Sequence, residues 1–435
     1  MKENLSIAMN GLAVGNLYRH ADGAMSFAYA QSWLDRPQSR PVSLSMPLRS
    51  QSYEGIVVYN FFENLLPDSQ EIISRIQARF QVASSHPFDL LSAVGRDCIG
   101  AIQIYPFQES PPPVNQVTAE PLDENSIAAI LRSYSLSPLG MDETSDFRIS
   151  LAGAQEKTAL LWHEGTWKRP TGSTPTSHIL KLPIGRIVYS NIDLSESCEN
   201  EWLCLKLAKA FGFPVPAAEL MDFDGQKVLV VERFDRRWSS DRKWLMRLPQ
   251  EDMCQALGIA PANKYEQQGG PGIRDIMTLL LGSDTPEADR KLFFKAQVFY
   301  WLLAAIDGHG KNFSIFLKAG GGYSMTPLYD ILSAYPLFSG KGLQRQKVKM
   351  AMAFTGKNRH YEWHTILPRH FLSTGDACGL APAQAKRYLQ EIIDVAEQAI
   401  ASVSSQLPSG FPAHIAETII SGISHQAGIL KMSIR

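Results

Sequence analysis

The feature that most constrains this chain is an apolar stretch that leads directly into a polar hexapeptide. Residues 292–306 are apolar around most of the circumference of a helix, because Phe293, Phe299 and Trp301 fall on different faces. A helix of this kind has to lie in a protein core. The hexapeptide Asp307-Gly308-His309-Gly310-Lys311-Asn312 follows it. The hexapeptide therefore emerges from the core at the end of a rigid helix, which is a common place for functional groups.

A second aspartate, Asp330, follows the hexapeptide beyond a short segment of β character. An Asp, an Asn shortly after it and a second Asp beyond a strand is the order found in kinases. There they supply a carboxylate that orients the acceptor hydroxyl and two Mg²⁺ ligands. The order predicts phosphoryl transfer, with Asp307 as the catalytic residue and Asn312 and Asp330 as metal ligands. The simpler alternative is a turn built from ordinary turn-forming residues, with Asp330 capping a helix.

Length and composition describe a globular chain with a large core. Its 435 residues suffice for about two to three domains. A content of 45% hydrophobic and 20% charged residues is typical of globular proteins. No apolar run reaches the roughly 20 residues of a membrane helix, and the start Met1-Lys2-Glu3-Asn4-Leu5 lacks the features of a secretory signal. We therefore expect a cytoplasmic protein that has no membrane partner.

Cysteine spacing and net charge exclude other classes of site. The 5 cysteines are scattered without a CxxC pair, so neither a disulfide framework nor a structural zinc site is expected. The net charge of −1 gives no overall attraction to nucleic acid. Any contact with DNA has to come from a local patch or from a partner protein.

The first 110 residues predict a small β-rich domain. Strands are expected at 5–9 and 12–18 about the hairpin dipeptide Asn10-Gly11, and the same alternation continues at 24–30 and 41–46. Helices are predicted at 56–66, at 70–80 and from Ser85, and a strand at 99–105. The run Pro111-Pro112-Pro113 marks a stiff connector. The predicted division is a β-rich domain at 1–110, a linker with a short helix at 111–145, an ATP-binding β-rich lobe at 146–234 and a helical catalytic lobe at 235–435.

A strand, a loop of small residues and a second strand follow the linker. The strands are predicted at 147–151 and 158–162, and the loop between them runs from Ala152 to Lys157. Kinases cover the nucleotide phosphates with a loop of this geometry, because its backbone N–H groups approach the phosphate oxygens without obstruction. Gly153 is the single glycine in the loop, so a plain hairpin turn is the alternative.

Lys181 stands alone among aliphatic residues in the predicted strand 178–182. A buried lysine is costly unless its charge meets an anion, such as a nucleotide phosphate or a carboxylate. An edge-strand lysine that faces water is the alternative. The helix predicted at 195–211 carries Glu199 and Glu201 in its first turns. In protein kinases a Glu from such a helix pairs with the strand lysine, and both residues remain candidates here, as does a helix-dipole role.

A predicted hinge separates the β-rich lobe from a helical one. The apolar strand 226–233 ends in a short polar segment, where the backbone groups of Glu232, Arg233 and Phe234 are expected to be free for an adenine edge. Helices are then predicted near 250–257, 273–281, 292–306, 382–403 and 411–423. The predicted fold class is therefore α+β: a bilobal kinase-like fold with a small β-rich N-terminal domain and a mainly helical C-terminal lobe.

With these residues in view, the chain resembles the HipA toxin family of bacterial serine/threonine kinases over essentially its whole length. The motifs that carry the resemblance are FRISLAGAQEK at 147–157, HILKLP at 178–183, VERFDRR at 231–237, LPQEDM at 248–253, DGHGKN at 307–312 and YDI at 329–331. The segments FFENLLPD at 61–68 and PFDLL at 87–91 are similar to the front domain of that family.

The resemblance implies ATP- and Mg²⁺-dependent phosphorylation of a protein serine by a toxin linked to growth arrest and persistence. Glutamyl-tRNA synthetase is the substrate known for the family's best-studied type. A small HipB-like helix-turn-helix antitoxin would neutralise the toxin, and the pair would repress their own operon on operator DNA. Ser150 falls on the family's autophosphorylated serine. The implied nucleotide-binding residues are Ala152, Gly153, Ala154, Gln155, Glu156, Lys157, Lys181, Glu232, Arg233, Phe234, His309, Lys311, Asn312, Tyr329 and Asp330.

The chain departs from the family in its expected DNA contact. The segment 373–379, predicted to begin a C-terminal helix, lacks the basic side chains expected there, so operator DNA is expected mainly through the antitoxin. The basic residues Lys341, Arg345, Lys347, Lys349, Lys357 and Arg359 are interpreted as a solvated loop. Two other functions remain open: a small-molecule kinase on the same fold, and a catalytically idle scaffold of a DNA-bound repressor. A scaffold has no physical need for Lys181, Asp307, Asn312 and Asp330 together.

Overall fold

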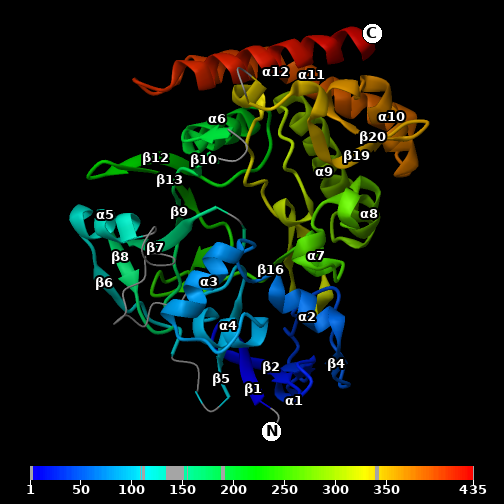
Figure 1. The fold of residues 1–435 in the computed structure, drawn as a ribbon. Helices are drawn as coiled ribbons and strands as arrows, with labels where there is room; N and C mark the ends of the chain where they lie inside the picture. The colour runs from blue at the N-terminus through cyan, green and yellow to red at the C-terminus, as the bar shows by residue number, and fades with distance from the viewer. Residues whose placement is uncertain are drawn as a thin grey trace. The chain divides into compact units, whose positions relative to one another are not determined.

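A computed structural model describes residues 3–107, 109, 113–133, 151–153, 155–187, 192–338 and 342–434 (Figure 1). The chain forms two compact units. Unit 1 comprises Met1–Leu182, Met221–Ala262 and Ile315–Tyr323. Unit 2 comprises Pro183–Leu220, Asn263–Ser314 and Ser324–Arg435. The four-part division drawn from the sequence stays a prediction.

A five-stranded sheet organises the N-terminal part of unit 1. Its strand order is β4-β3-β2-β1-β5, formed by β1 (Glu3–Met9), β2 (Leu12–Arg19), β3 (Met25–Tyr29), β4 (Tyr53–Glu54) and β5 (Ile102–Pro106). The predicted hairpin is confirmed, because Asn10 and Gly11 adopt φ values of 46° and 75°, as a two-residue turn requires. One core cluster joins this sheet to the helices α2 (Ile56–Glu63), α3 (Gln70–Arg79) and α4 (Pro87–Val94) (Figure 1).

The strand predicted at 41–46 is wrong. This segment forms only an isolated bridge between Ser43 and Met46. The hydroxyls of Ser43 and Ser45 both donate to the carbonyl of Gln255, at 3.2 and 2.9 Å. Serine side chains that bond to backbone in this way compete with a strand ladder, which explains why the alternating pattern did not yield a strand. The short helix α1 (Gln31–Leu34) precedes this segment.

A second, six-stranded sheet has the order β12-β13-β9-β7-β8-β6. Its strands are β6 (Ala119–Pro121), β7 (Lys157–His163), β8 (Thr166–Pro170), β9 (His178–Lys181), β12 (Ala218–Phe223) and β13 (Gln226–Glu232). The helix α5 (Glu124–Arg132) packs Ile127 and Leu131 with Trp167 and Val228 of this sheet. The strands predicted around Lys181 and before the hinge are therefore confirmed. The strand predicted at 147–151 falls mostly outside the described residues.

Smaller β elements complete the sheet inventory of the described chain. They are β10 (Gly185–Ile187) with β11 (Ile192–Leu194), β14 (Arg236–Trp238) with β15 (Leu245–Arg247), β16 (Gln250–Asp252) with β17 (Ser314–Leu317) and β18 (Tyr323–Met325), and β19 (Lys349–Thr355) with β20 (Arg359–Glu362). The helix predicted near 250–257 begins later than expected, as α7 (Met253–Ala256). Asp252 caps it with a capping box, and the residues before it form β16 instead.

Unit 2 is mainly helical. Its long helices are α6 (Ser197–Ala210), α8 (Ile273–Leu279), α9 (Pro286–Leu303), α10 (Pro368–Ala377), α11 (Pro382–Ser404) and α12 (Ala413–Ile434) (Figure 1). Of the helices in the described ranges, none is both long and apolar enough to cross a membrane. The prediction that 373–379 begins a C-terminal helix is wrong, because these residues end α10. The mixture of strands and helices confirms the predicted α+β class.

Candidate active site

The apolar helix α9 delivers the hexapeptide through a sharp turn. The predicted helix at 292–306 begins earlier and ends earlier than expected, because Ala304 adopts the left-handed conformation with φ of 50°. Its neighbour Ala305 donates to the carbonyl of Tyr300 at 2.8 Å, which closes the helix end. The next turn passes close to the Tyr300 ring. A Cβ atom at Gly308 would lie 2.5 Å from Tyr300 Cδ2, so only glycine fits there.

The hexapeptide is held by bonds to its own backbone. The Asn312 side-chain N–H donates to the carbonyl of Asp307 at 2.7 Å, and the backbone N–H of His309 donates to the same carbonyl at 2.8 Å. His309, Lys311 and Asn312 are buried, whereas the Asp307 side chain is 59% exposed. The loop therefore fixes the backbone of Asp307 and leaves its carboxylate accessible. A residue that orients an acceptor hydroxyl has to be accessible in this way.

The second predicted aspartate sits on a strained backbone next to a tyrosine that contacts the hexapeptide. The Tyr329 hydroxyl donates to the carbonyl of Lys311 at 2.8 Å and also bonds the Ser314 hydroxyl. Asp330 has φ of 57°, a conformation that costs free energy for a residue other than glycine and often marks a functional site. Within unit 2, the structure thus bonds Tyr329, the chain neighbour of Asp330, to the loop that carries Asp307, Lys311 and Asn312.

Sequence reasoning missed the residues that anchor the segment after Asp330. The Asn200 amide on α6 donates to the carbonyl of Ser333 and accepts from its N–H, each at 2.8 Å. The Ser333 hydroxyl donates to the carbonyl of Leu303, the last residue of α9, at 2.6 Å. An asparagine at the first turn of a buried helix was the available signal, since such a polar group needs partners. These bonds tie the Asp330 segment to both α6 and α9.

A second missed residue contacts the predicted catalytic group directly. Tyr265 lies just before the short helix η4 (Glu266–Gln268), and its hydroxyl donates a hydrogen bond to Asp307 Oδ1. Its ring meets the His309 ring edge-on, with centroids 5.0 Å apart and planes at 90°. The Asp307 Oδ2 atom lies 4.0 Å from His309 Nε2. Nothing in the spacing of the sequence links residue 265 to 307.

In unit 1, two lysines face each other across adjacent strands. Lys157 of β7 and Lys181 of β9 are register partners, 8% and 7% exposed. Like charges directly opposite each other repel, and burial adds to the cost of each ammonium group. The phosphates of a nucleotide carry several charges of the opposite sign. A pair of lysines in this position therefore suits the phosphates of a nucleotide.

The loop before β7 passes close to one of these lysines. Gly153 has φ of 109°, and a Cβ atom there would lie 2.5 Å from Lys157 Nζ. The positive φ favours glycine here, and the loop backbone passes close to the ammonium group. The loop is attached to β9, because the Gln155 side chain donates to the carbonyl of Leu182 at 2.6 Å and the Leu182 N–H to that of Glu156 at 3.2 Å. Ala152 is half-buried beside it, while the predicted residues Ser150 and Ala154 lie outside the described part of the chain.

The predicted hinge differs from expectation at Arg233. Its backbone N–H donates to the carbonyl of Ser177 at 2.9 Å, so this group is not free for an adenine edge. Its guanidinium is fully buried and bonds Asp235 at 2.8 and 3.0 Å. Arg233 therefore stabilises the fold of the hinge. Glu232 is exposed, and the half-buried Phe234 packs edge-on against Phe316 with centroids 5.9 Å apart.

Arg233 belongs to a buried charge network that joins the hinge to the segment between α4 and β5. Asp97 accepts from Arg236 at 2.9 Å and from Arg247 at 3.0 Å, and also from the Thr176 hydroxyl at 2.8 Å. Burial alone would raise the pKa of Asp97, but the three guanidinium groups lower it well below its usual value. The network stays charged, and it fixes the position of the polypeptide between β13 and β14.

The side chains of unit 2 fit a magnesium ion by the chemistry of their donors. Because the Asn312 side-chain N–H is committed to the Asp307 carbonyl, its Oδ1 is the atom left for a cation. Asp330 adds a carboxylate. In the described ranges, no group of three His, Cys, Asp or Glu residues is arranged for a metal. Mg²⁺ in kinases is commonly held by one or two protein ligands together with phosphates and water, so Asn312 and Asp330 are the residues that would hold it.

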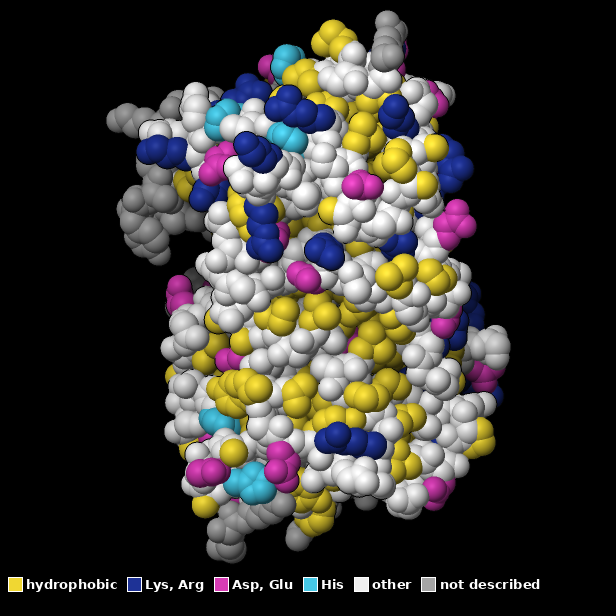
Figure 2. All heavy atoms as spheres, turned by 90° about the vertical axis from the view of Figure 1, so that its right-hand side faces the viewer, with side chains coloured by type: hydrophobic (Ala, Val, Ile, Leu, Met, Phe, Trp, Pro, Cys, Tyr) yellow, Lys and Arg dark blue, Asp and Glu magenta, His cyan; other side chains and the backbone are white. Residues whose placement is uncertain are grey.

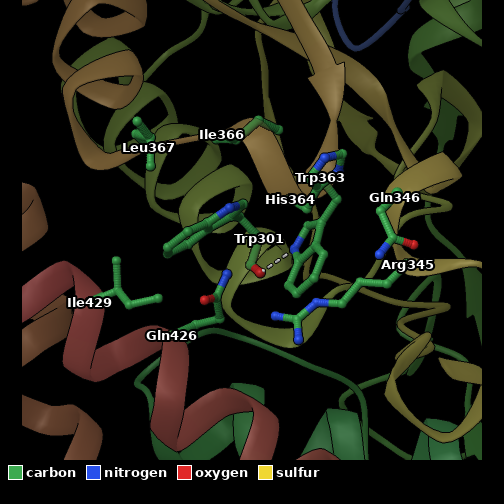
Figure 3. Close-up of a pocket in the computed structure, with 9 residues that line it drawn as sticks. All are labelled: Trp301, Arg345, Gln346, Trp363, His364, Ile366, Leu367, Gln426 and Ile429. Atoms are coloured by element: carbon green, nitrogen blue, oxygen red, sulfur yellow. Dashed lines mark hydrogen bonds between the residues drawn. The ribbon is translucent and has the colours of Figure 1, made fainter. Parts of the chain in front are cut away.

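A separate pocket of about 270 Å³ lies beside the C-terminal turns of α9 in unit 2 (Figure 3). Trp301 and Trp363 form its walls, and the Trp363 indole donates to the carbonyl of Trp301 at 2.9 Å. Arg345 lies over the Trp363 ring at 4.9 Å. No Asp or Glu occurs among the described residues that line the pocket, so it lacks the ligands that a magnesium–nucleotide complex needs.

Comparisons with known proteins identify the family to which the chain is similar. Residues 149–400 match the HipA-like C-terminal domain, and residues 5–105 match the HipA N-terminal domain. The chain is 34% identical to "Putative kinase Y4mE" of Sinorhizobium fredii, covering 92% of this chain and 91% of that one. It is 28% identical to the serine/threonine-protein kinase toxin HipA of Shewanella oneidensis, covering 76% and 75%.

A solved structure shows the same fold. The chain matches the structure titled as the Shewanella oneidensis toxin–antitoxin system HipA, HipB and its operator DNA complex, with a TM-score of 0.80 and 24% identity over 98% of each chain. This likeness confirms the predicted kinase-like fold. Together with the two domain matches and the relatives named as kinases, it shows that the chain belongs to the HipA-like serine/threonine kinase toxin family.

Proposed function

We propose that this protein is a toxin kinase that transfers the γ-phosphoryl group of ATP to a serine or threonine of a protein. The observation that carries the proposal lies in unit 2: an accessible Asp307 carboxylate on a fixed loop that also carries Asn312, with Tyr329, the chain neighbour of Asp330, bonded to the same loop. Residues with these roles, in this chain order, perform phosphoryl transfer in kinases.

The chemistry follows from what each residue can do. Asp307 accepts a hydrogen bond from the acceptor hydroxyl, holds it in line with the γ-phosphorus and receives its proton. Lys157 and Lys181 carry charge that compensates the nucleotide phosphates. When bound by Asn312 and Asp330, Mg²⁺ neutralises charge on the transferred group. Because transfer by kinases depends mainly on positioning and electrostatics, rigid support of these residues is the main contribution of the fold.

We assign the acceptor and partners from the family. The proposed protein acceptor is a serine of glutamyl-tRNA synthetase, and the proposed internal acceptor is Ser150. A HipB-like antitoxin is the proposed partner, and the activity is assigned to the cytoplasm, where ATP and this acceptor occur. Persistence after growth arrest belongs to the same proposal.

Operator DNA is proposed to be reached mainly through the antitoxin. Figure 2 shows Lys and Arg side chains in the upper part of one face, with acidic and histidine side chains among them. In the predicted basic cluster, Arg359 pairs with Glu266 at 3.4 Å and Lys349 lies 4.0 Å from Glu362. These two residues begin the strands β20 and β19, so the expected solvated loop is in part a hairpin. Such partly neutralised charge gives weak support for direct DNA binding.

Incubation of the purified protein with labelled ATP, Mg²⁺ and glutamyl-tRNA synthetase tests the proposal. Label on the synthetase and on Ser150, located by mass spectrometry, is the expected result. Label on neither protein but on small molecules of a cell extract would favour a small-molecule kinase.

Paired expression of the wild type and the Asp307→Asn variant tests the toxin role. Growth arrest by the wild type alone, relieved by the antitoxin, is expected. Equal arrest by both would favour the scaffold of a repressor complex, because arrest would then be independent of phosphoryl transfer.

A further inference from the structure

The hydroxyl of Tyr265 has the position relative to Asp307 that an acceptor hydroxyl needs. It donates its hydrogen bond to Asp307 Oδ1, and a kinase aspartate accepts the same bond from the substrate hydroxyl. We infer that Tyr265 occupies the acceptor position of Asp307 in the resting enzyme, and that a protein acceptor enters by displacing it. This inference rests on the proposed phosphoryl transfer and adds a residue that determines which hydroxyls gain access.

The segment that carries Tyr265 is attached to the hexapeptide on one side. The N–H of Gly310 donates to the carbonyl of Lys264 at 3.1 Å, and the His309 ring packs edge-on against the Tyr265 ring. These contacts hold the ring next to Asp307 without enclosing it, since the Asp307 side chain is 59% exposed. The tyrosine hydroxyl is therefore a local group that competes with any other hydroxyl for Oδ1.

On its other side the segment is anchored to the β19–β20 hairpin. The Glu266 carboxylate accepts from the backbone N–H of Ala353 at 2.6 Å and pairs with Arg359 at 3.4 Å. The chain passes from unit 1 into unit 2 between Ala262 and Asn263, only shortly before Tyr265. The residue thus lies at the start of unit 2, held from both sides. Because Tyr265 is only partly buried, its side chain has room to rotate away while the backbone stays in place.

The contact has a consequence for water. An exposed carboxylate beside ATP can orient water as well as a serine hydroxyl. A water oxygen would then form a bond to the γ-phosphorus, the bond to the ADP oxygen would break, and the water proton would pass to Asp307. The Tyr265 hydroxyl occupies Oδ1, which leaves only Oδ2, 4.0 Å from His309 Nε2, to orient a water molecule. It therefore suppresses hydrolysis of ATP until an acceptor arrives.

The Tyr265→Phe variant tests both the occupied acceptor position and the suppression of ATP hydrolysis. A hydrogen bond to a charged group contributes about 1.5–3 kcal/mol, which corresponds to at least about a tenfold change in occupancy. We expect ATP hydrolysis without acceptor to rise about tenfold, and KM for the protein acceptor to fall by a similar factor, because the competing state is removed. The kcat for transfer should stay within about twofold of the wild type, since Tyr265 takes no part once it is displaced.

The matched control is Tyr361→Phe, whose hydroxyl interacts with Glu266 and Arg359 and thus with the anchor of the same segment. It should leave both hydrolysis and KM unchanged. If wild type and variants all transfer phosphate but Tyr265→Phe alters neither quantity, the inference fails while the kinase proposal stands.

A crystal structure of the full chain without acceptor gives a reading that does not depend on activity. The Tyr265 hydroxyl within hydrogen-bond distance of Asp307 is the expected result. A tyrosine turned away from Asp307 would overturn the inference even if no phosphoryl transfer were found, and in that case the absence of transfer would separately contradict the proposed function.

Discussion

Replacing Asp97 with asparagine should destabilise unit 1 strongly, because this carboxylate balances three buried guanidinium groups. Arg233 and Arg236 are at most 1% exposed and Arg247 is 2% exposed. The isosteric amide keeps the volume but removes the negative charge. Three positive charges then remain buried with Asp235 as the nearby acid. Breaking a buried ion pair from one side typically costs about 3–5 kcal/mol.

The magnitude translates into a shift that denaturation can detect. With a urea dependence of about 3 kcal/mol per molar, the upper part of the range for small proteins, the midpoint of unit 1 unfolding should fall by about 1 M or more. Circular dichroism measured against urea gives this midpoint. The matched control is Asp224→Asn, which breaks the Asp224–Arg132 pair, whose side chains are 55% and 49% exposed. Exposed pairs contribute about 0–1 kcal/mol, so the control should shift the midpoint little.

The same network makes stability depend on acid. Because the pKa of Asp97 is lowered in the folded protein, its contribution is present above the unfolded pKa of about 3.9 and is lost as pH falls through the folded value. The wild type should therefore lose an increment of stability below about pH 4 that Asp97→Asn lacks. Equal urea midpoints for Asp97→Asn and Asp224→Asn would refute the reasoning that the network is held by this charge.

Three further changes follow from the geometry. Burial raises the pKa of Glu251 to about 8. The contribution of this residue to the free energy of unfolding is therefore fully present below its unfolded pKa and declines as pH rises toward 8. The free energy of unfolding of Glu251→Gln, measured by urea denaturation relative to that of the wild type, should therefore rise by roughly 3 kcal/mol between pH 5 and pH 8. Gly308→Ala drives a Cβ atom into Tyr300 and should cost about 1–3 kcal/mol, with lower transfer activity. Gly428→Ala, where nothing lies within 4 Å, is the control for melting temperature. Asp330→Ala should raise the Mg²⁺ concentration needed for half-maximal transfer, and an unchanged Mg²⁺ titration would remove Asp330 from the metal site.

Local patterns carried most of the fold prediction. The Asn10-Gly11 hairpin, the strand around Lys181 and the long helices of unit 2 follow from turn chemistry and apolar periodicity. Errors occur where side chains or caps override the pattern. Ser43 and Ser45 replace a strand with side-chain bonds, and the Asp252 cap delays α7. Ala304 ends α9 early by adopting the left-handed conformation, which the apolar periodicity does not predict.

The candidate site was predictable where its residues are close in sequence. Asp307 and Asn312 bond each other within one loop, so their spacing carries the information. Tyr265 and Asn200 are far from the residues they contact, at 307 and 333. A single sequence does not show which distant residues such side chains contact. The backbone N–H of Arg233 was misread for the same reason, since its acceptor, the carbonyl of Ser177, lies on a distant part of the chain.

The most direct test of the central claim compares phosphoryl transfer by the wild type and by Asp307→Asn under identical ATP and Mg²⁺ concentrations. The amide keeps the shape of the carboxylate but cannot accept the hydroxyl proton. We expect at least about a 100-fold lower rate, the usual contribution of a general base, with an unchanged melting temperature because the side chain is largely exposed. A rate within about threefold of the wild type, far below the loss expected of a general base, would contradict the assignment of Asp307 and the kinase mechanism built on it.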